Sequence, residues 1–234
     1  MATQHHAQDH ADRKLHAAQR ALQFVEPGMT LGLGSGSTAT LWIQLLGEQV
    51  RDHGLKLRGA IASSEDSERL GRSYGIPFVT FEECHTLDLT VDGADEIAPG
   101  LALIKGGGGK LLREKIVASA SKRFVIVADE SKLVDKLGRF PLPVEVIPMA
   151  ASLVHNSLRE LGFSPATRLD PDGKPYITDQ GNHVLDCSGL LLDHPDAMAA
   201  KLDSIVGVVE HGLFLHMANL AVIAGATQVF ERAP

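Results

Sequence analysis

Cysteine is scarce in this chain. The 234 residues include two cysteines, Cys84 and Cys187, and no CxxC pair. Two isolated cysteines cannot form the disulfide framework of a small secreted domain, so the composition favours a reducing compartment. We expect each cysteine to be a buried free thiol.

Long apolar runs and excess positive charge are also missing. No segment approaches the roughly 18 apolar residues of a membrane span. The N-terminal MATQHHAQDH has no apolar signal region, so we expect a cytoplasmic protein without membrane contacts. The net charge of −7 argues against nucleic acid as a partner. An anionic small molecule would need local cations such as Lys105, Lys110 or Lys132.

What is present is enough apolar sequence, 44% of the residues, to bury the core of one large domain or two small ones. Helical and strand-like patterns alternate in the first part of the chain. This alternation predicts an α/β fold with a wound, mostly parallel sheet and helices on both faces. The expected helices are 11–25, 38–50, 64–74 and 110–121, and the expected strands are 29–34, 57–62, 77–79, 87–92, 101–104 and 124–128.

The pattern changes after Asp129. Three prolines surround the strand-like VEVI, a helix is expected at 149–161, and hairpin turns follow without crossover helices. This predicts a small α+β domain at 137–207, inserted near the C-terminal third of the chain. The α/β domain would then comprise 1–136 and 208–234, with two strands in 207–225 returning to its sheet.

The segment 92–115 reads DGADE, a spacer, IKGGGGK and LLREK, and it concentrates reactive side chains. Asp92 and Asp95 follow an alternating apolar run, which places them at the carboxyl end of a strand, where open α/β sheets bind ligands. Lys105 precedes four consecutive glycines, which suit backbone in close contact with a ligand. Glu114 lies in the first or second turn of the next helix. We therefore predict that these side chains converge on one site.

Two plainer interpretations compete with this one. DGADE is also typical of an ordinary Asp-Gly turn with solvated acids. KGGGGK alone is typical of a flexible linker, but linkers are not normally flanked by apolar, periodic segments. Because both motifs lie in one short stretch, we favour a functional site.

A second candidate site is the turn GSGST. It connects the strand 29–34 to the helix 38–50, so free backbone N–H groups and the hydroxyls of Ser35, Ser37 and Thr38 would form a pocket suited to phosphate. The dinucleotide-binding fingerprint is met only in part, because Ser37 stands where its third glycine belongs. A Walker loop is excluded, since no Lys-Ser or Lys-Thr follows. A plain strand-to-helix turn remains the alternative.

Six segments, taken in order, resemble the type A ribose-5-phosphate isomerase family over nearly the whole chain. They are GLGSGSTA at 32–39, SSEDS at 63–67, DGADEI at 92–97, KGGGG with LLREKI at 105–116, DESK at 129–132 and FPLPVEVIPMA at 140–150. The resemblance implies interconversion of D-ribose 5-phosphate and D-ribulose 5-phosphate in the pentose phosphate pathway, without a metal or an organic cofactor. It also implies a cytosolic homodimer or dimer of dimers.

The resemblance also implies roles for residues. Glu114, in the REK motif, matches the proton acceptor, and Asp92 is favoured as the group that moves a proton during ring opening. Sequence alone does not separate Asp92 from Asp95 in that step. Lys110 departs from the family, which usually has a small residue there. The substrate-binding residues implied are Ser35, Gly36, Ser37, Thr38, Asp92, Gly93, Ala94, Asp95, Lys105, Gly106, Gly107, Gly108 and Lys132.

The chemistry of aldose–ketose isomerisation supports these roles. The reaction moves a proton between adjacent carbons through a cis-enediolate, and one carboxylate, here Glu114, can perform both transfers. Negative charge develops on oxygen in the enediolate, so a fixed cation stabilises the transition state. We assign that role to Lys105, held by Asp95 or Asp92. Asp95 would also position the hydroxyls of the sugar.

Three other functions compete with isomerisation. A sugar-phosphate sensor domain of a regulator would bind the ligand without converting it and would need no base. A nicotinamide dehydrogenase would carry an acid near the end of the second strand, where residues 57–64 offer only serines. An acyl-CoA transferase would use Glu96 or Glu114 as a nucleophile and require CoA. The combination of motifs favours the isomerase.

Overall fold

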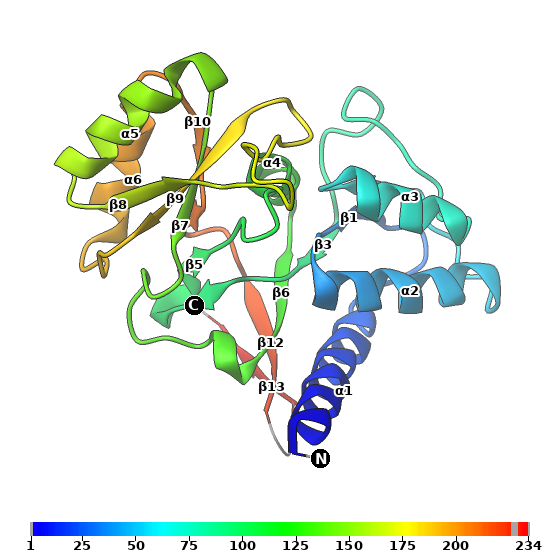
Figure 1. Ribbon diagram of the computed structural model, residues 1–234. Helices are drawn as coiled ribbons and strands as arrows, with labels where there is room; N and C mark the ends of the chain where they lie inside the picture. Colours follow the sequence, from blue (N-terminus) through cyan, green and yellow to red (C-terminus); the bar gives the residue numbers. More distant parts are fainter. Residues whose placement is uncertain (1, 226–228, 234) are drawn as a thin grey trace. The chain divides into compact units, whose positions relative to one another are not determined.

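The computed structural model of the chain describes residues 2–225 and 229–233 (Figure 1). These residues divide into two compact units. The first unit comprises Met1–Ala94, Arg113–Lys132 and Met217–Pro234, and the second comprises Asp95–Leu112 and Leu133–His216. The domain boundaries inferred from the sequence stay a prediction.

A six-stranded sheet forms the core of the first unit, with the strand order β13-β12-β6-β3-β1-β2. Neighbouring strands from β12 to β2 run parallel, and β13 is antiparallel to β12. The predicted wound, mostly parallel sheet is therefore confirmed. Its strands are β1 (Thr30–Leu33), β2 (Gly59–Ala62), β3 (Leu89–Asp92), β6 (Phe124–Asp129), β12 (Leu220–Ala224) and β13 (Val229–Arg232).

Helices cover both faces of this sheet. Leu31 and Leu33 of β1 share one face and join an apolar cluster with Trp42 of α2. Gly32 faces the other way, and a Cβ added to it would lie 2.7 Å from Cγ1 of Val117 in α4. Because successive strand residues point to opposite sides, α2 and α4 lie on opposite faces, as predicted. The helices are α1 (Ala2–Leu22), α2 (Ser37–Arg51), α3 (Glu65–Ser73) and α4 (Leu111–Ser119).

The second unit contains two antiparallel sheets. The larger one, in the order β10-β7-β9-β8, buries Val144 of β7 and Leu185 of β9 with Val154 and Leu158 of α5. An antiparallel sheet with its own helices and apolar core agrees with the predicted α+β insertion. Its strands are β7 (Leu142–Val146), β8 (Ser164–Thr167), β9 (His183–Ser188) and β10 (Val208–His211), and its helices are α5 (Ala151–Glu160) and α6 (Pro195–Asp203).

The smaller sheet has the order β11-β5-β4. Its strands are β4 (Glu96–Ile97), β5 (Leu103–Ile104) and β11 (Leu213–Phe214). Short 3₁₀ helices are η1 (Pro99–Leu101), η2 (Glu130–Lys132) and η3 (Pro148–Ala150). Within the described residues, no helix combines the length and the apolar character that a bilayer crossing requires.

The C-terminal strands differ from the expectation. β12 joins the six-stranded sheet, but β10 pairs with β7 and β11 pairs with β5. The prediction that two strands in 207–225 return to the first sheet is therefore wrong for the first of them. An alternating pattern predicts a strand, but it does not identify a partner about 60 residues earlier in the chain.

The two cysteines differ in burial. Cys187 in β9 is buried, and this burial raises the pKa of its thiol to about 12. Cys84 is partly exposed, and its Sγ donates to the carbonyl of Thr86 at 3.1 Å. The expectation of a buried thiol is correct for Cys187 and wrong for Cys84, which lies in a surface loop between α3 and β3.

Candidate active site

Asp92 is the last residue of β3 and connects two predicted motifs. Its side chain is 1% exposed. Oδ1 accepts the N–H of Ser35 at 2.8 Å and the N–H of Gly93 at 2.7 Å. A Cβ added to Gly34 would lie 2.4 Å from Cγ of Asp92, so a side chain at position 34 would displace the carboxylate. Asp92 of the DGAD motif and the GSGST turn therefore meet at one edge of the six-stranded sheet.

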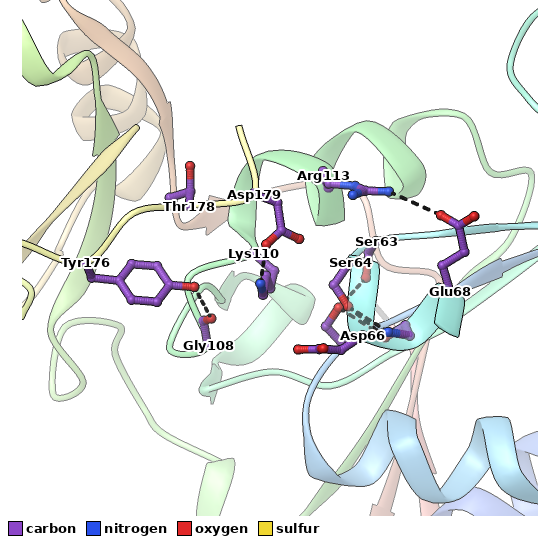
Figure 2. A network of polar contacts seen from close by, with 12 residues as sticks. Ser63, Ser64, Asp66, Glu68, Gly108, Lys110, Arg113, Tyr176, Thr178 and Asp179 are labelled. Atoms are coloured by element: carbon purple, nitrogen blue, oxygen red, sulfur yellow. Dashed lines mark hydrogen bonds and ion pairs between the residues drawn. The ribbon is translucent and has the colours of Figure 1, made fainter. Parts of the chain in front are cut away.

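The GSGST turn leads from β1 into α2. Gly36 precedes the first residue of α2 and has a φ of 88°, a conformation that favours glycine. Ser35 Oγ lies 2.7 Å from Ser63 Oγ, and Ser67 Oγ donates to the carbonyl of Gly34 at 2.7 Å. The serines at the start of α3 thus brace the turn at the point where the sequence predicts a phosphate pocket. Ser63 and Ser64 are visible in Figure 2.

Lys14 is a candidate that the sequence reasoning missed. Its Nζ donates to Ser37 Oγ at 2.9 Å, which places a cation at the start of α2. The sequence holds only an indirect signal for it, the helical spacing of Lys14 with three alanines. Lys14 shares a face of α1 with Ala17, Ala18 and Ala21, which are buried, so it lies on the packed side of the helix.

Lys132 lies just beyond the carboxyl end of β6, in η2. β6 is the parallel neighbour of β3, so Lys132 and Asp92 come from the same edge of the sheet. Asp129, the last residue of β6, accepts the N–H of Ser131 at 2.9 Å and thereby fixes the turn before Lys132. Lys132 is half-buried.

Glu114 lies in the first turn of α4, as the sequence predicts. Its side chain is 6% exposed. A carboxylate near the N-terminus of a helix is stabilised by the backbone dipoles. The preceding residue, Arg113, lies 3.9 Å from Glu68 through Nη2 and Oε2 (Figure 2), so α3 holds the solvent side of this turn.

In the second unit, Lys105 and Asp95 flank the glycine loop. Lys105 is 2% exposed, its backbone N–H donates to the carbonyl of Gly212 at 2.9 Å, and its Nζ lies 5.4 Å from the ring centre of Phe214. An ammonium over an aromatic face is attracted by the ring quadrupole. Asp95 Oδ2 accepts the N–H of Gly107 at 2.7 Å. The loop is therefore attached to its surroundings, which argues against a flexible linker.

Three of the four glycines at 106–109 are explained by packing and backbone geometry. Gly106 has a φ of 101° and Gly109 a φ of 75°, and both would meet neighbours if they carried a Cβ. A Cβ on Gly107 would lie 2.6 Å from Asp95 Oδ1. Gly108 is different, since a Cβ there would have nothing within 4 Å. Open space beside exposed backbone is a place that a ligand could approach.

The start of α4 is also held by residues that the sequence reasoning did not identify. Glu145 of β7 is fully buried, and its Oε1 accepts the Thr178 hydroxyl at 2.8 Å and the Asn182 amide at 3.0 Å. Burial raises the pKa of the Glu145 carboxyl, an effect that these bonds and the backbone N–H of Leu112 reduce. Lys110, the departure from the family pattern, forms an ion pair with Asp179 (Figure 2).

Glu96 holds the backbone of the segment 138–140. Its side chain is 2% exposed, Oε2 accepts the N–H of Gly138 at 2.8 Å, and Oε1 accepts the N–H of Phe140 at 2.5 Å. Both oxygens are therefore occupied by backbone groups, which does not suit the nucleophile of an acyl-CoA transferase.

Replacing Glu96 by Ala should destabilise the protein by about 2 to 4 kcal/mol, because two backbone N–H groups would lose a charged acceptor. Urea unfolding monitored by circular dichroism would measure the change. Glu160→Ala is the control, since Glu160 is exposed at the end of α5 in the same unit. Equal stability of both variants would show that Glu96 does not support the 138–140 segment.

One cluster has the composition of a metal site. Asp203, Glu210 and His211 have potential ligand atoms within 4.8 Å of one another. However, Nδ1 of His211 accepts the N–H of Leu213 at 3.2 Å, so the proton of the neutral ring is on Nε2, which lies 3.1 Å from Asp203 Oδ1. A metal at Nε2 would require the opposite tautomer and break the bond to Leu213. The cluster is better explained as a buried histidine with a carboxylate partner.

The predicted site residues fall into two groups, one in each unit. The first unit holds Ser35, Gly36, Ser37, Thr38, Asp92, Gly93, Ala94, Glu114 and Lys132. The second unit holds Asp95, Lys105, Gly106, Gly107 and Gly108. Within the first group the N–H of Ser35 bonds to Asp92, and within the second the N–H of Gly107 bonds to Asp95. The convergence of the two groups stays a prediction.

Comparisons with known proteins identify relatives over almost the full length of the chain. Residues 59–228 match the family described as Ribose 5-phosphate isomerase A (phosphoriboisomerase A). The chain is 50% identical over 216 residues to ribose-5-phosphate isomerase A of Roseiflexus sp. (strain RS-1), covering 92% of this chain and 93% of the relative. It is 51% identical over 230 residues to that of Nitrobacter hamburgensis, covering 94% and 97%.

Solved structures agree with the sequence comparisons. Ribose 5-phosphate isomerase A from Methanocaldococcus jannaschii has a TM-score of 0.91 and 40% identity, covering 95% of this chain and 99% of that one. A D-ribose-5-phosphate isomerase in complex with phospho-erythronic acid has a TM-score of 0.92 and 34% identity, covering 95% and 98%. From the matching motifs, the fold and these relatives, we conclude that the chain belongs to the ribose 5-phosphate isomerase A family.

Proposed function

We propose that the protein interconverts D-ribose 5-phosphate and D-ribulose 5-phosphate by proton transfer through a cis-enediolate. The observation that carries this proposal is the similarity to ribose-5-phosphate isomerases over 92% of the chain. A relative with 34% identity is a D-ribose-5-phosphate isomerase in complex with phospho-erythronic acid, a sugar-acid phosphate. The geometry of each unit supplies groups that such a reaction needs.

Glu114 is the base in this proposal. It removes the proton from the carbon next to the carbonyl and returns it to the neighbouring carbon, so one carboxylate serves both half-reactions. Its near-complete burial and its place at the start of α4 support the role, since little water competes with the substrate for this carboxylate.

Lys105 and the two aspartates act on the oxygens of the sugar. The ammonium of Lys105 stabilises the developing enediolate oxygen, and its burial strengthens that interaction. Asp92 moves a proton between the ring oxygen and the anomeric hydroxyl during ring opening. Asp95, held by the N–H of Gly107, positions hydroxyls of the open chain.

The phosphate group binds at the start of α2 in this proposal. Ser35, Ser37 and Thr38 supply hydroxyls, and the first backbone N–H groups of α2 together with Gly36 supply donors. Lys132 adds a cation from the same edge of the sheet, and Lys14 adds a second one that contacts Ser37. The remaining contacts to the sugar come from Gly93, Ala94, Gly106, Gly107 and Gly108.

The wider setting is also part of the proposal. As a member of this family, the protein would act in the cytoplasm, in the non-oxidative pentose phosphate pathway, as a homodimer or dimer of dimers. It would use no metal and no organic cofactor, so activity should persist in the presence of EDTA.

The decisive experiment is to mix the purified protein with ribose 5-phosphate and to follow ketose formation. Steady conversion to an equilibrium mixture supports the isomerase. Binding of ribose 5-phosphate, measured by calorimetry, without any ketose formation would instead identify a sugar-phosphate sensor.

Gly108→Ala tests whether the glycine loop contacts substrate. A methyl group at position 108 meets open space, so the free energy of unfolding should change by no more than about 0.5 kcal/mol. We expect KM for ribose 5-phosphate to rise by about tenfold, because the methyl group would occupy room that the sugar needs. Glu160→Ala is the control, since Glu160 is exposed at the end of α5 in the same unit. Unchanged KM in Gly108→Ala would move the substrate away from this loop.

A further inference from the structure

We propose that Arg168 is a positioning residue for the reaction, because it fixes the peptide between Gly106 and Gly107, one residue beyond Lys105. This inference rests on the proposed function, in which Lys105 and Asp95 act on the sugar. Arg168, Asp95 and the glycine loop all belong to the second unit, so their contacts are defined within it.

The side chain of Arg168 is itself held firmly. Arg168 directly follows β8, and its backbone N–H donates to the carbonyl of Val184 at 2.9 Å. Nε donates to Asp186 Oδ2 at 2.9 Å, and Nη2 pairs with Asp186 Oδ1. Two parallel bonds to one carboxylate fix the plane of the guanidinium. The side chain is 14% exposed, so solvent competes little for these bonds.

The free edge of this guanidinium is directed at the glycine loop. Nη1 donates to the carbonyl of Gly106 at 2.9 Å and to the carbonyl of Gly107 at 3.1 Å. Hydrogen bonds from a charged donor are stronger than those between neutral groups. A fixed cation therefore selects the direction in which both carbonyls point.

The peptide between Gly106 and Gly107 is held at both of its polar ends. Arg168 binds its carbonyl oxygen, and the carboxylate of Asp95 accepts its N–H at 2.7 Å. Rotation of this peptide would break both bonds at once. Glycine allows such rotation more readily than other residues, since it has no Cβ, and Gly106 already has a φ of 101°. These two hydrogen bonds, from Arg168 and to Asp95, form a clamp on the peptide. The clamp prevents the rotation that the glycines of the loop would otherwise permit.

Two catalytic assignments depend on this clamp. This peptide lies one residue beyond Lys105, so its orientation limits the path of the backbone that continues from the lysine into the loop. The same peptide supplies the donor that orients Asp95. Loss of Arg168 should therefore disturb both the ammonium of Lys105 and the carboxylate of Asp95. The hairpin formed by β8 and β9 should keep its fold, because β8 pairs with β9 and β9 pairs with β7.

Other contacts from the same hairpin hold the later part of the loop (Figure 2). The hydroxyl of Tyr176 lies 3.4 Å from the carbonyl of Gly108, and Lys110 pairs with Asp179. These contacts limit how far the loop can move when Arg168 is replaced. The expected effect is thus a local misplacement and not loss of the loop structure.

The test is Arg168→Ala, compared with wild type and with Arg159→Ala, an exposed arginine on α5. Misplacement of catalytic groups by about 1 Å can lower the rate on the order of 100-fold. We expect kcat for ribose 5-phosphate to fall by about 10- to 100-fold, with a smaller rise in KM, because the phosphate contacts, which lie elsewhere, are retained. Arg159→Ala should match wild type.

Chemical rescue separates positioning from a general loss of structure. Methylguanidinium added to folded Arg168→Ala should restore kcat by about fivefold or more, because it can occupy the space beside Asp186 and bind the two carbonyls. Arg168→Lys keeps the charge but cannot make two parallel bonds to Asp186 as well as contact both carbonyls. It should retain the fold and lose about tenfold in kcat.

The outcomes distinguish this inference from the proposed function. If wild type does not form ketose, the proposed function fails, and amide exchange at Gly107 still tests the clamp, since exchange should accelerate at least about tenfold in Arg168→Ala. If wild type is active, kcat and KM within about twofold of wild type in folded Arg168→Ala and Arg168→Lys would overturn the inference. A fall in kcat that only follows the loss of folded protein, without rescue, would also overturn it.

Discussion

Glu114→Gln is expected to lower kcat by about 10²- to 10⁴-fold, the contribution of a positioned general base. Glutamine has the shape of glutamate but cannot accept the proton. The side chain is 6% exposed in the first turn of α4, so the isosteric change should preserve the packing there. Binding of ribose 5-phosphate should remain close to that of wild type, since substrate recognition is assigned to other groups. Steady-state kinetics and calorimetry would measure both quantities.

Solvent exchange makes the test specific for proton transfer. In deuterated water, wild type should incorporate solvent hydrogen into the sugar phosphate as it isomerises, and Glu114→Gln should lose incorporation and isomerisation equally. Glu48→Gln, an exposed change on α2, is the control. Activity of Glu114→Gln within about tenfold of wild type would end the role of this carboxylate as the base.

The parts of the fold that the sequence predicted are those with a local pattern. Leu89 and Val91 belong to a run that alternates with polar residues, and this period identified β3. The prolines and turns after Asp129 identified the antiparallel region. Where the backbone leaves an ordinary conformation, the prediction was less accurate. Leu101 has a φ of 54° after Gly100, so the strand expected at 101–104 begins only at Leu103.

Some residues of the candidate site were predicted from the sequence and others were not, because only some of them lie in a local motif. Glu114, Lys105 and the aspartates lie in one continuous stretch, so the motif reveals them together. Lys14 and Arg168 do not share this advantage. Each contacts a motif that is far away in the sequence, Ser37 in one case and the carbonyls of the glycine loop in the other. No spacing rule in a single sequence relates such positions, because the pairing of β8 with β9 and the packing of α1 create the contacts.

Lys105→Met is expected to lower kcat by about 10²- to 10³-fold, which is the typical cost of removing one donor to a developing oxyanion. Methionine retains the unbranched apolar stem of lysine and removes the charge. This choice suits a side chain that is 2% exposed, because a truncation to alanine would also create a cavity. KM should rise less than kcat falls, since the ammonium binds the enediolate more strongly than the neutral substrate.

Lys136→Met is the control for this result. It removes a charge from a lysine of the same unit that is 58% exposed, and it should leave kcat unchanged. Circular dichroism would establish that both variants are folded. A substrate analogue that resembles the enediolate should then lose far more affinity for Lys105→Met than ribose 5-phosphate does, because only the analogue carries the negative oxygen that the ammonium stabilises. If KM rises while kcat stays within about threefold of wild type, Lys105 holds the substrate without stabilising the transition state, and the charge of the enediolate must be balanced by another group.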